Sequence, residues 1–160
     1  MWTLMDSPVG EVRIVERDGL ITDLEFFPFR PNTDGRPIGD RDDAHPVLVR
    51  AVEQLTAYFA RDLKEFDLPL APHGSSFQRR VWDALLGIEY GETASYGEIA
   101  RRLGLTNAAS RAVGSANGRN PIAIVIPCHR VIGANGTLIG YAGGLERKRT
   151  LLGIEQEALF

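Results

Sequence analysis

Cysteine is almost absent from this sequence, since Cys128 is the single thiol among 160 residues. One cysteine cannot form an internal disulfide, and zinc sites built from several cysteines are excluded. A lone free thiol is typical of proteins in a reducing compartment. We therefore expect a cytoplasmic protein that holds no structural metal.

Long apolar runs are also missing, and no stretch approaches the roughly 20 residues that a membrane-spanning helix needs. Residues 1–6 contain neither a basic segment nor an apolar core, so no signal peptide is predicted. The composition, 44% hydrophobic and 24% charged, is typical of globular proteins. A chain of 160 residues suffices for one domain or for two small lobes, and we expect no membrane partner.

The two halves of the sequence differ in charge. Residues 1–74 hold 8 Lys and Arg against 14 Asp and Glu, a net charge of −6. Residues 75–160 hold 10 against 7, a net charge of +3. This asymmetry indicates that the second half meets a polyanion, although solvated surface charge is the alternative. Its cations are mostly arginines, which suit phosphates and base edges; they include Arg101, Arg102, Arg111, Arg119 and Arg130.

The apolar residues 121–126 directly precede the polar triplet Cys128-His129-Arg130. We interpret the apolar run as a strand with active-site groups at its end. The histidine and arginine could favour the thiolate, which is the nucleophilic form of cysteine. A buried cysteine that serves as a small hydrophobic side chain is the commoner outcome, and the local pattern leaves both readings open.

The first lobe, residues 1–70, is predicted to be an antiparallel sheet covered by a helix. Residues 11–16 and 20–26 alternate in polarity around a turn at Arg17-Asp18-Gly19. Pro46 suits a helix start, and the following apolar residues recur at helical spacing. A loop over 28–46 and a short strand over 65–70 complete the lobe; the helical stripe comprises Leu48, Ala51, Val52, Leu55, Tyr58 and Phe59.

The second lobe, residues 77–160, follows a linker over 71–76 and is predicted to be mainly helical. Capping boxes open helices at Ser75 to Gln78 and at Ser95 to Glu98. The second of these helices ends before Gly104, and Asn107 is expected to cap a third helix over 108–117. Two short helices joined by a glycine-bearing turn are typical of helix-turn-helix units. A final helix spans 145–155, so the class is α/β (α+β).

The predicted helix over 108–117 carries mostly small side chains around Arg111. Tight packing inside the protein explains such a helix, but so does insertion into a narrow DNA groove. Farther on, residues 134–137 indicate a hairpin turn. The glycine-rich loop 140–144 lacks the lysine of a phosphate-binding loop, so no nucleotide site is predicted there.

These motifs together resemble the O6-alkylguanine-DNA alkyltransferases. The run Pro127-Cys128-His129-Arg130-Val131 matches the active-site signature of that family. Six further motifs accompany it in the family's order, and the resemblance covers about residues 75–155; they are FQRRVW at 77–82, YGET at 90–93, SYGEIA at 95–100, RAVG at 111–114, NGRNP at 117–121 and GYAGG at 140–144. The first lobe fits the family's ribonuclease-H-like sheet domain.

The resemblance implies that Cys128 accepts an alkyl group from guanine O6 in an irreversible, single-turnover repair reaction that needs no cofactor. His129 would act as a base through a bridging water, and Glu155 would orient the imidazole. Asn120 would be the hinge between the DNA-reading helix and the active-site turn. The guanine pocket would be lined by Tyr96, Val131, Tyr141 and Ala142.

The resemblance also implies a partner, double-stranded DNA containing alkylated bases. Arg111 would fill the gap left by the flipped nucleotide, because the target atom is stacked inside the duplex. The other residues expected at the DNA are Ala109, Ala112, Ser115, Arg119 and Arg130. We interpret the protein as a monomer, and cooperative binding along DNA stays open.

Three departures from the family pattern stand out. Some relatives hold zinc in the first domain, and residues 1–74 lack the cysteines for such a site. The turn over 103–107 is one residue longer than in some relatives, so the following helix is free to tilt differently. Ala142 replaces a serine, which leaves its backbone amide available to the base.

Two other functions remain. An alkyltransferase-like module recognises alkylguanine without reacting, but such proteins lack the acceptor cysteine. An unrelated cysteine hydrolase using Cys128 and His129 would need repeated turnover and an oxyanion hole. The sequence patterns do not specify four properties: the preferred adduct size, the preference between O6-alkylguanine and O4-alkylthymine, the protein partners, and the role of the loop over 28–46.

Overall fold

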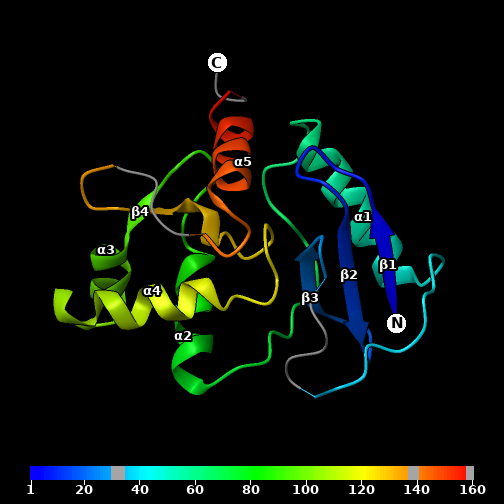
Figure 1. Cartoon of the computed structure of the whole chain (residues 1–160), viewed down its shortest axis with the longest axis horizontal. Helices are drawn as coiled ribbons and strands as arrows, with labels where there is room; N and C mark the ends of the chain where they lie inside the picture. The colour runs from blue at the N-terminus through cyan, green and yellow to red at the C-terminus, as the bar shows by residue number, and fades with distance from the viewer. Residues whose placement is uncertain (30–34, 137–140, 158–160) are drawn as a thin grey trace. The chain divides into compact units, whose positions relative to one another are not determined.

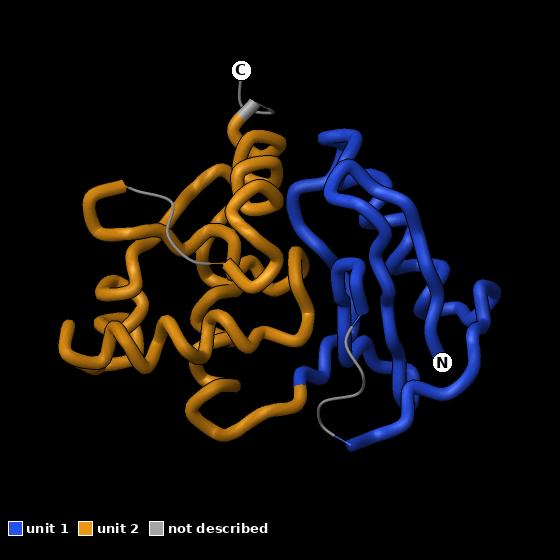
Figure 2. Tube along the Cα trace, in the orientation of Figure 1, with its two compact units in different colours: residues 1–72 blue, residues 73–160 orange. Residues whose placement is uncertain are grey.

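The computed structural model describes residues 1–29, 35–136 and 141–157. The chain divides into two compact units, residues 1–72 and 73–160, which Figure 2 shows in different colours. The mixed α/β class predicted from the sequence is confirmed, because a three-stranded antiparallel sheet precedes a set of helices. Within the described residues, no helix is long and apolar enough to cross a membrane.

Unit 1 is built on an antiparallel sheet in the order β1-β2-β3 (Figure 1), formed by Trp2–Met5, Val12–Arg17 and Leu20–Phe26. Asp18 and Gly19 form a two-residue turn between β2 and β3, with φ angles of 54° and 80°. A type I′ turn, whose twist matches that of the flanking strands, requires positive φ angles at both of its central residues. The predicted turn and its flanking strands are therefore confirmed.

Helix α1, Pro46–Phe59, packs on this sheet. Proline stands in its first turn, where the missing N–H costs nothing, and the His45 side chain accepts a hydrogen bond from the Val47 amide at 3.3 Å. The predicted stripe supplies the buried face, namely Leu48, Ala51, Leu55 and Tyr58. The burial of this stripe stabilises the unit through the hydrophobic effect.

The strand expected over residues 65–70 is wrong. Only Leu70 forms a bridge, parallel to Ile21. Pro69 has no amide to donate, although its carbonyl accepts from Ile21 at 2.8 Å. The chain therefore pairs with β3 at a single point.

Unit 2 is mainly helical in its described part. Two short strands, β4 and β5, pair in parallel. The elements in chain order are α2 (Ser76–Leu85), β4 (Ala94–Ser95), α3 (Tyr96–Arg102), η1 (Asn107–Ala109), α4 (Ser110–Gly118), η2 (Cys128–Arg130), β5 (Val131–Ile132) and α5 (Leu145–Glu157).

Helix α2 begins and packs as predicted. Ser75 and Gln78 form the full capping box, with both reciprocal hydrogen bonds present. Val81, Trp82 and Leu85 are buried. The Trp82 indole Nε1 donates to the Ala116 carbonyl at 2.8 Å, which fixes α4 against α2.

The helix-turn-helix unit is present as α3, η1 and α4. The Gly104 and Leu105 amides donate to the Arg101 and Ala100 carbonyls, both at 2.9 Å, and Gly104 has a φ of 76°. These two bonds define a Schellman ending, which needs a residue with positive φ and so favours glycine. At the start of α3, Ser95 accepts from the Glu98 amide as expected.

The expected capping role of Asn107 is wrong. Its side-chain oxygen accepts from Arg101 Nη1 at 2.6 Å instead, so it ties η1 back to α3. An asparagine side chain turns to a charged donor within reach because such hydrogen bonds are stronger than neutral ones.

The strand expected over residues 121–126 is also wrong. This segment is a buried series of turns in which the Ile126 amide donates to the Ile122 carbonyl at 3.1 Å. Ile124 has a φ of 69°, which is rare for a β-branched side chain and marks a strained backbone. An apolar run predicts burial but does not decide between strand and turn. Cys128 therefore lies on a compact turn, η2, and not at the end of a strand.

Candidate active site

Cys128 lies in unit 2 on the short helix η2, between the end of α4 and the chain leading to α5 (Figure 1). Its relative exposure is 5%, so the side chain is buried. The whole segment from Ile122 to Arg130 is buried with it. The sulfur is thus less accessible than a surface nucleophile, but the polar side chains of Asn120, Tyr141 and Lys148 act on it.

Burial raises the pKa of the Cys128 thiol above its ordinary value. The Asn120 and Tyr141 side chains act on this pKa in the opposite direction, as does the positive charge of Lys148. The sequence pattern predicted that His129 and Arg130 would favour the thiolate. The groups that do so in the structure come from the chain just after α4, from the chain before α5, and from α5 itself.

His129 is fully buried and faces α5. Its Nε2 lies 2.6 Å from Glu155 Oε2. Burial lowers the pKa of His129, so the neutral imidazole is favoured and donates its Nε2 proton to the carboxylate. Nδ1 then carries a lone pair, and no described residue hydrogen-bonds to it. The imidazole is therefore oriented by a carboxylate and has an open acceptor, as a general base requires.

Arg130 does not lie where we expected a DNA contact, and that prediction is corrected. Its side chain is buried, and its Nε donates to Glu155 Oε1 at 2.8 Å. Its Nη1 donates to the Ile88 carbonyl at 2.7 Å. A buried guanidinium must be paired, and this one is used within unit 2. Arg130 and His129 together hold the Glu155 carboxylate.

Lys148 was missed in the sequence interpretation. Its side chain is buried in α5, where Nζ donates to the Val131 carbonyl, and burial lowers its pKa. A signal was available, because positions 148, 151, 152 and 155 share one helix face. Leu151 and Leu152 mark that face as buried, so the two charged residues on it must be paired or functional.

We predict that Lys148→Met shifts the pH profile of Cys128 reactivity to higher pH. The thiolate is the reactive form, so the rate rises with pH up to the thiol pKa. Removal of the positive charge takes away one influence that lowers this pKa. The measurement is the single-turnover rate of Cys128 alkylation against pH, with a several-fold lower rate expected near neutrality.

The matched control for this prediction is Arg149→Met, which removes the same charge from the neighbouring, exposed position of α5. Arg149→Met should not shift the pH profile of Cys128 alkylation. Equal profiles for Lys148→Met and the native protein would contradict the assigned influence of Lys148.

Asn120 and Tyr96 lie beside the acceptor turn. The Asn120 side chain donates to the Ile126 carbonyl at 2.8 Å and accepts from the Ile122 amide at 3.0 Å, so it links the end of α4 to the turn. Tyr96 is half-buried at the start of α3, and burial together with the charge of Cys128 raises its pKa.

The structure places the other predicted pocket residues in three environments. Val131 is buried in β5 and offers its carbonyl to Lys148. Tyr141 is half-buried, and Ala142 is exposed in the turn closed by the Gly144 amide on the Tyr141 carbonyl at 2.9 Å. Residues 137–140, which include the predicted Gly140, lie outside the described part of the chain.

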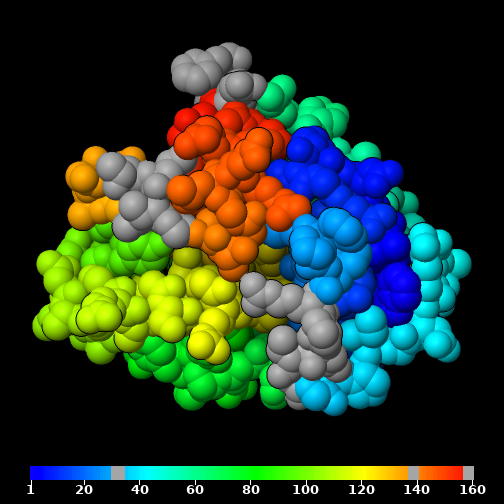
Figure 3. Space-filling model, in the orientation of Figure 1, coloured from blue at the N-terminus to red at the C-terminus, as the bar shows by residue number. Residues whose placement is uncertain are grey.

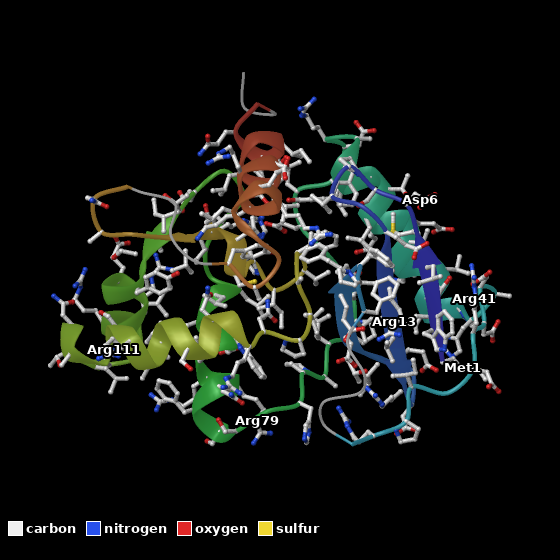
Figure 4. All side chains as sticks on the ribbon, in the orientation of Figure 1. Met1, Asp6, Arg13, Arg41, Arg79 and Arg111 are labelled. Carbon is white, nitrogen blue, oxygen red and sulfur yellow. The ribbon has the colours of Figure 1, made fainter. Side chains whose placement is uncertain are left out.

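The outer face of α4 carries the residues expected at DNA. Arg111, Ala112 and Ser115 are exposed on α4, and Arg119 is exposed just after it. Ala109 is half-buried in η1. Figure 3 shows the green and yellow atoms of α3 and α4 at the surface of unit 2, and Figure 4 labels Arg111 on α4 and Arg79 on α2. The helix therefore presents small side chains and an arginine to solvent.

Comparison with known proteins identifies this arrangement. The family model described as "6-O-methylguanine DNA methyltransferase, DNA binding domain" matches residues 76–157. The model of the same family's ribonuclease-like domain matches residues 1–72. The chain belongs to the 6-O-methylguanine DNA methyltransferase family. The resemblance seen in the sequence is confirmed for both units.

Individual members of the 6-O-methylguanine DNA methyltransferase family are similar over nearly the whole chain. A methylated-DNA–protein-cysteine methyltransferase of Methanosarcina acetivorans is 63% identical, over 96% of this chain and 97% of that protein. The crystal structure of the Mycobacterium tuberculosis O6-methylguanine methyltransferase is 47% identical with a TM-score of 0.88, covering 98% of this chain and 93% of that one. A second structure, of Mycobacterium tuberculosis OGT in complex with DNA, is 48% identical with a TM-score of 0.86 and the same coverage.

Proposed function

We propose that this protein repairs O6-alkylguanine in double-stranded DNA by moving the alkyl group to its own Cys128. The observation that carries the proposal is the setting of the only thiol. Cys128 is buried among polar side chains at the end of the exposed helix α4, beside a His129–Glu155 pair. The relatives in this family are named for methyl transfer from DNA to protein cysteine, which supports the same chemistry here.

The reaction is a direct displacement. The Cys128 sulfur attacks the alkyl carbon, forming a C–S bond as the bond from that carbon to O6 breaks. The thiol proton passes to His129 Nδ1 through a bridging water, and the electrons of the broken bond leave with the guanine. The guanine regains a proton, so normal guanine and S-alkylcysteine are the products. Nothing in this balance needs a cofactor or a metal.

Each side chain at the site has a part in this step. The Asn120 and Tyr141 side chains lower the pKa of the Cys128 thiol, and the positive charge of Lys148 favours the thiolate in the same way. The Tyr96 hydroxyl serves as a proton donor to the base, because a raised pKa keeps it protonated. His129 is held by Glu155 so that Nδ1 accepts the thiol proton.

The guanine pocket is formed by backbone around Cys128, Val131 and Ala142, with Tyr141 as a wall. Alkylation at O6 removes the N1 proton, so the 2-amino group is the only hydrogen-bond donor left on the Watson–Crick edge. Carbonyl oxygens are suitable acceptors for it. The Cys128 and Val131 carbonyls flank the acceptor turn and are assigned this role.

DNA reaches the site along α4. The lesion must leave the stack before the sulfur can reach it, and a damaged pair is easier to open. The thin face with Ala112 and Ser115 enters the minor groove, and Arg111 occupies the gap left by the flipped base. Arg119 meets a phosphate, and Ala109 lies at the edge of this surface. The DNA complex of the Mycobacterium tuberculosis protein supports DNA as the partner.

The test is incubation of the monomeric protein with a duplex that carries one labelled O6-methylguanine. Transfer of one label per protein, with a mass gain of one methylene unit on the peptide holding Cys128, is the expected result. Tight binding without transfer would indicate a recognition module, and release of free label with repeated turnover would indicate a hydrolase. Either outcome would refute the proposal.

We predict that Arg111→Ala weakens duplex binding roughly tenfold, the effect of losing one charge-assisted contact. The slope of log affinity against log salt should also fall by about one. Fluorescence anisotropy over a range of salt concentrations measures both quantities. Arg50→Ala, an equal loss of charge in α1, is the control and should change neither. Unaltered affinity in Arg111→Ala would exclude the assigned contact.

A further inference from the structure

The three consecutive cations of α5 lie in three different environments. Lys148 is buried, and Arg149 is exposed. Arg147 is half-buried, and its Nη1 donates to the Gly143 carbonyl at 3.1 Å. Gly143 belongs to the turn over residues 141–144, the pocket turn, so Arg147 contacts the backbone of a segment assigned to the guanine pocket.

The place of Arg147 in its helix is unfavourable for a cation. Arg147 stands in the first turn of α5, which begins at Leu145. The first turn of a helix carries the positive end of the helix dipole, and it favours acidic side chains. Side chains on a helix tilt toward its N-terminus, so a long side chain at this position reaches back to the residues before the helix. The contact with Gly143 therefore indicates a role in the pocket turn and not in the helix itself.

The pocket turn has few other means of keeping its shape. Gly143 and Gly144 have no side chains that could pack, and glycine leaves the backbone freer than any other residue. The Gly144 amide donates to the Tyr141 carbonyl at 2.9 Å, and the Lys148 amide donates to the Gly144 carbonyl at 3.2 Å. A hydrogen bond from a charged donor favours the arrangement it joins by roughly tenfold to a hundredfold in population. The guanidinium of Arg147 supplies such a bond.

Tyr141, the first residue of the pocket turn, acts on the acceptor thiol. Burial raises the pKa of the Cys128 thiol, and the Tyr141 side chain acts in the opposite direction. Among the described residues, the titratable and charged groups that face this thiol or the neighbouring His129 are Tyr96, Arg130, Tyr141, Lys148 and Glu155. We therefore expect Arg147 to influence the thiol through the pocket turn and not through its own charge.

We propose that Arg147 is a positioning residue, which braces the pocket turn from α5 and so holds Tyr141 where its side chain acts on Cys128. The proposal deepens the proposed function and rests on it, because the same turn forms one wall of the guanine pocket. Helix α5 then serves the acceptor cysteine in three ways. Arg147 holds the pocket turn, Lys148 favours the thiolate by its charge, and Glu155 orients the imidazole.

The experiment measures the rate of Cys128 alkylation against pH. The profile is recorded with duplex carrying O6-methylguanine and, separately, with iodoacetamide, a small reagent that needs no DNA. Arg147→Met keeps an unbranched side chain but has no donor, and Arg147→Ala takes its place if the first variant does not fold. Both profiles should move to higher pH, with a several-fold lower rate near neutrality, because the thiolate is the reactive form. Tyr141→Phe should move them in the same direction.

The double variant, Arg147→Met with Tyr141→Phe, tests whether the two residues act in series. Its shift should be no larger than that of Tyr141→Phe alone, because the brace then has no hydroxyl to hold in place. Shifts that add would overturn the proposal, since they would mean that the two side chains act on the thiol independently. An unshifted profile in Arg147→Met would also overturn it.

Arg149→Met is the matched control, because it removes the same charge from an exposed position of α5. Its profile should equal that of the native protein, and an equal shift in both arginine variants would overturn the proposal in favour of net charge. Thermal unfolding checks that every variant is folded. A native protein that reacts with iodoacetamide but takes no methyl group from the duplex would refute the proposed function, and the iodoacetamide profiles would still decide whether Arg147 acts through Tyr141.

Discussion

The variant Cys128→Ser should bind methylated duplex as tightly as the native protein and transfer no methyl group to itself. Serine keeps the size and polarity of the side chain, so the Asn120 and Asn117 contacts to this turn should persist. An alkoxide is a far stronger base than a thiolate, so the serine hydroxyl stays protonated at neutral pH in these surroundings. Loss of a nucleophile lowers rates by at least about a thousandfold.

Two measurements on the same sample decide this result. Mass spectrometry after incubation with methylated duplex reports transfer, and anisotropy reports binding. Because Cys128 is the only cysteine, methyl transfer in the serine variant would have to use another residue. A methylated Cys128→Ser protein would show that the acceptor has been assigned to the wrong side chain.

The second large effect is expected for Glu155→Gln. The variant leaves the buried Arg130 guanidinium without its carboxylate partner, and breaking such a pair costs about 3–5 kcal/mol of unfolding free energy. It also replaces the charged acceptor that orients His129 with a neutral amide, which no longer stabilises the imidazolium formed during transfer, so transfer should slow by about 100-fold, within the range of general-base effects. Chemical denaturation measures the first quantity, and single-turnover kinetics measures the second.

The pH dependence of stability provides an independent test of the same residue. Burial alone would raise the pKa of Glu155, but the hydrogen bonds and charges of His129 and Arg130 lower it from 4.5 to about 2. A carboxyl group whose pKa is lower in the folded than in the unfolded state stabilises the fold at pH values above its unfolded-state pKa. This stabilisation is lost as the pH falls through the folded-state pKa. The native protein should therefore lose about 3 kcal/mol of unfolding free energy between pH 4.5 and 2 through this carboxyl group. Glu155→Gln has no carboxyl group at this position and should not show this loss.

Glu146→Gln, in the exposed first turn of α5, is the matched control for both measurements. It should retain the acid-dependent loss of stability and the native transfer rate. The fold also loses stability as the pH falls below 6.5, because burial disfavours protonated His129. That loss should be larger in Glu155→Gln, which lacks the charge that raises the His129 pKa, so the comparison is made between pH 4.5 and 2. Identical acid unfolding of the native protein and Glu155→Gln would show that the carboxylate is not held as described.

The parts of the site found from the sequence are those that motifs encode directly. Cys128, His129 and Glu155 follow from the family resemblance, and the structure brings the last two into contact 26 positions apart in the chain. The helix caps at Ser75 and Ser95 also follow from local pattern, because each bond joins residues three apart. Short-range hydrogen bonds are the kind of interaction that a linear pattern can specify.

The parts that were missed depend on tertiary contacts. Arg130 was assigned to DNA because it is cationic in a basic half, yet Glu155 and the Ile88 carbonyl hold it inside. The turn around Ile124 was read as a strand, because its apolar residues are buried in either conformation. Asn117 is polar on an apolar face, and only the fold shows that the Cys128 carbonyl lies next to it.

The near-complete burial of the sole sulfhydryl has a practical consequence. A bulky maleimide can react with Cys128 only when the turn around it opens, since 5% of the residue is exposed in the closed form. The labelling rate therefore measures how often this segment opens, with no competing thiol to correct for. The cysteine proposed to accept the alkyl group thus also serves as a probe of local unfolding in this segment.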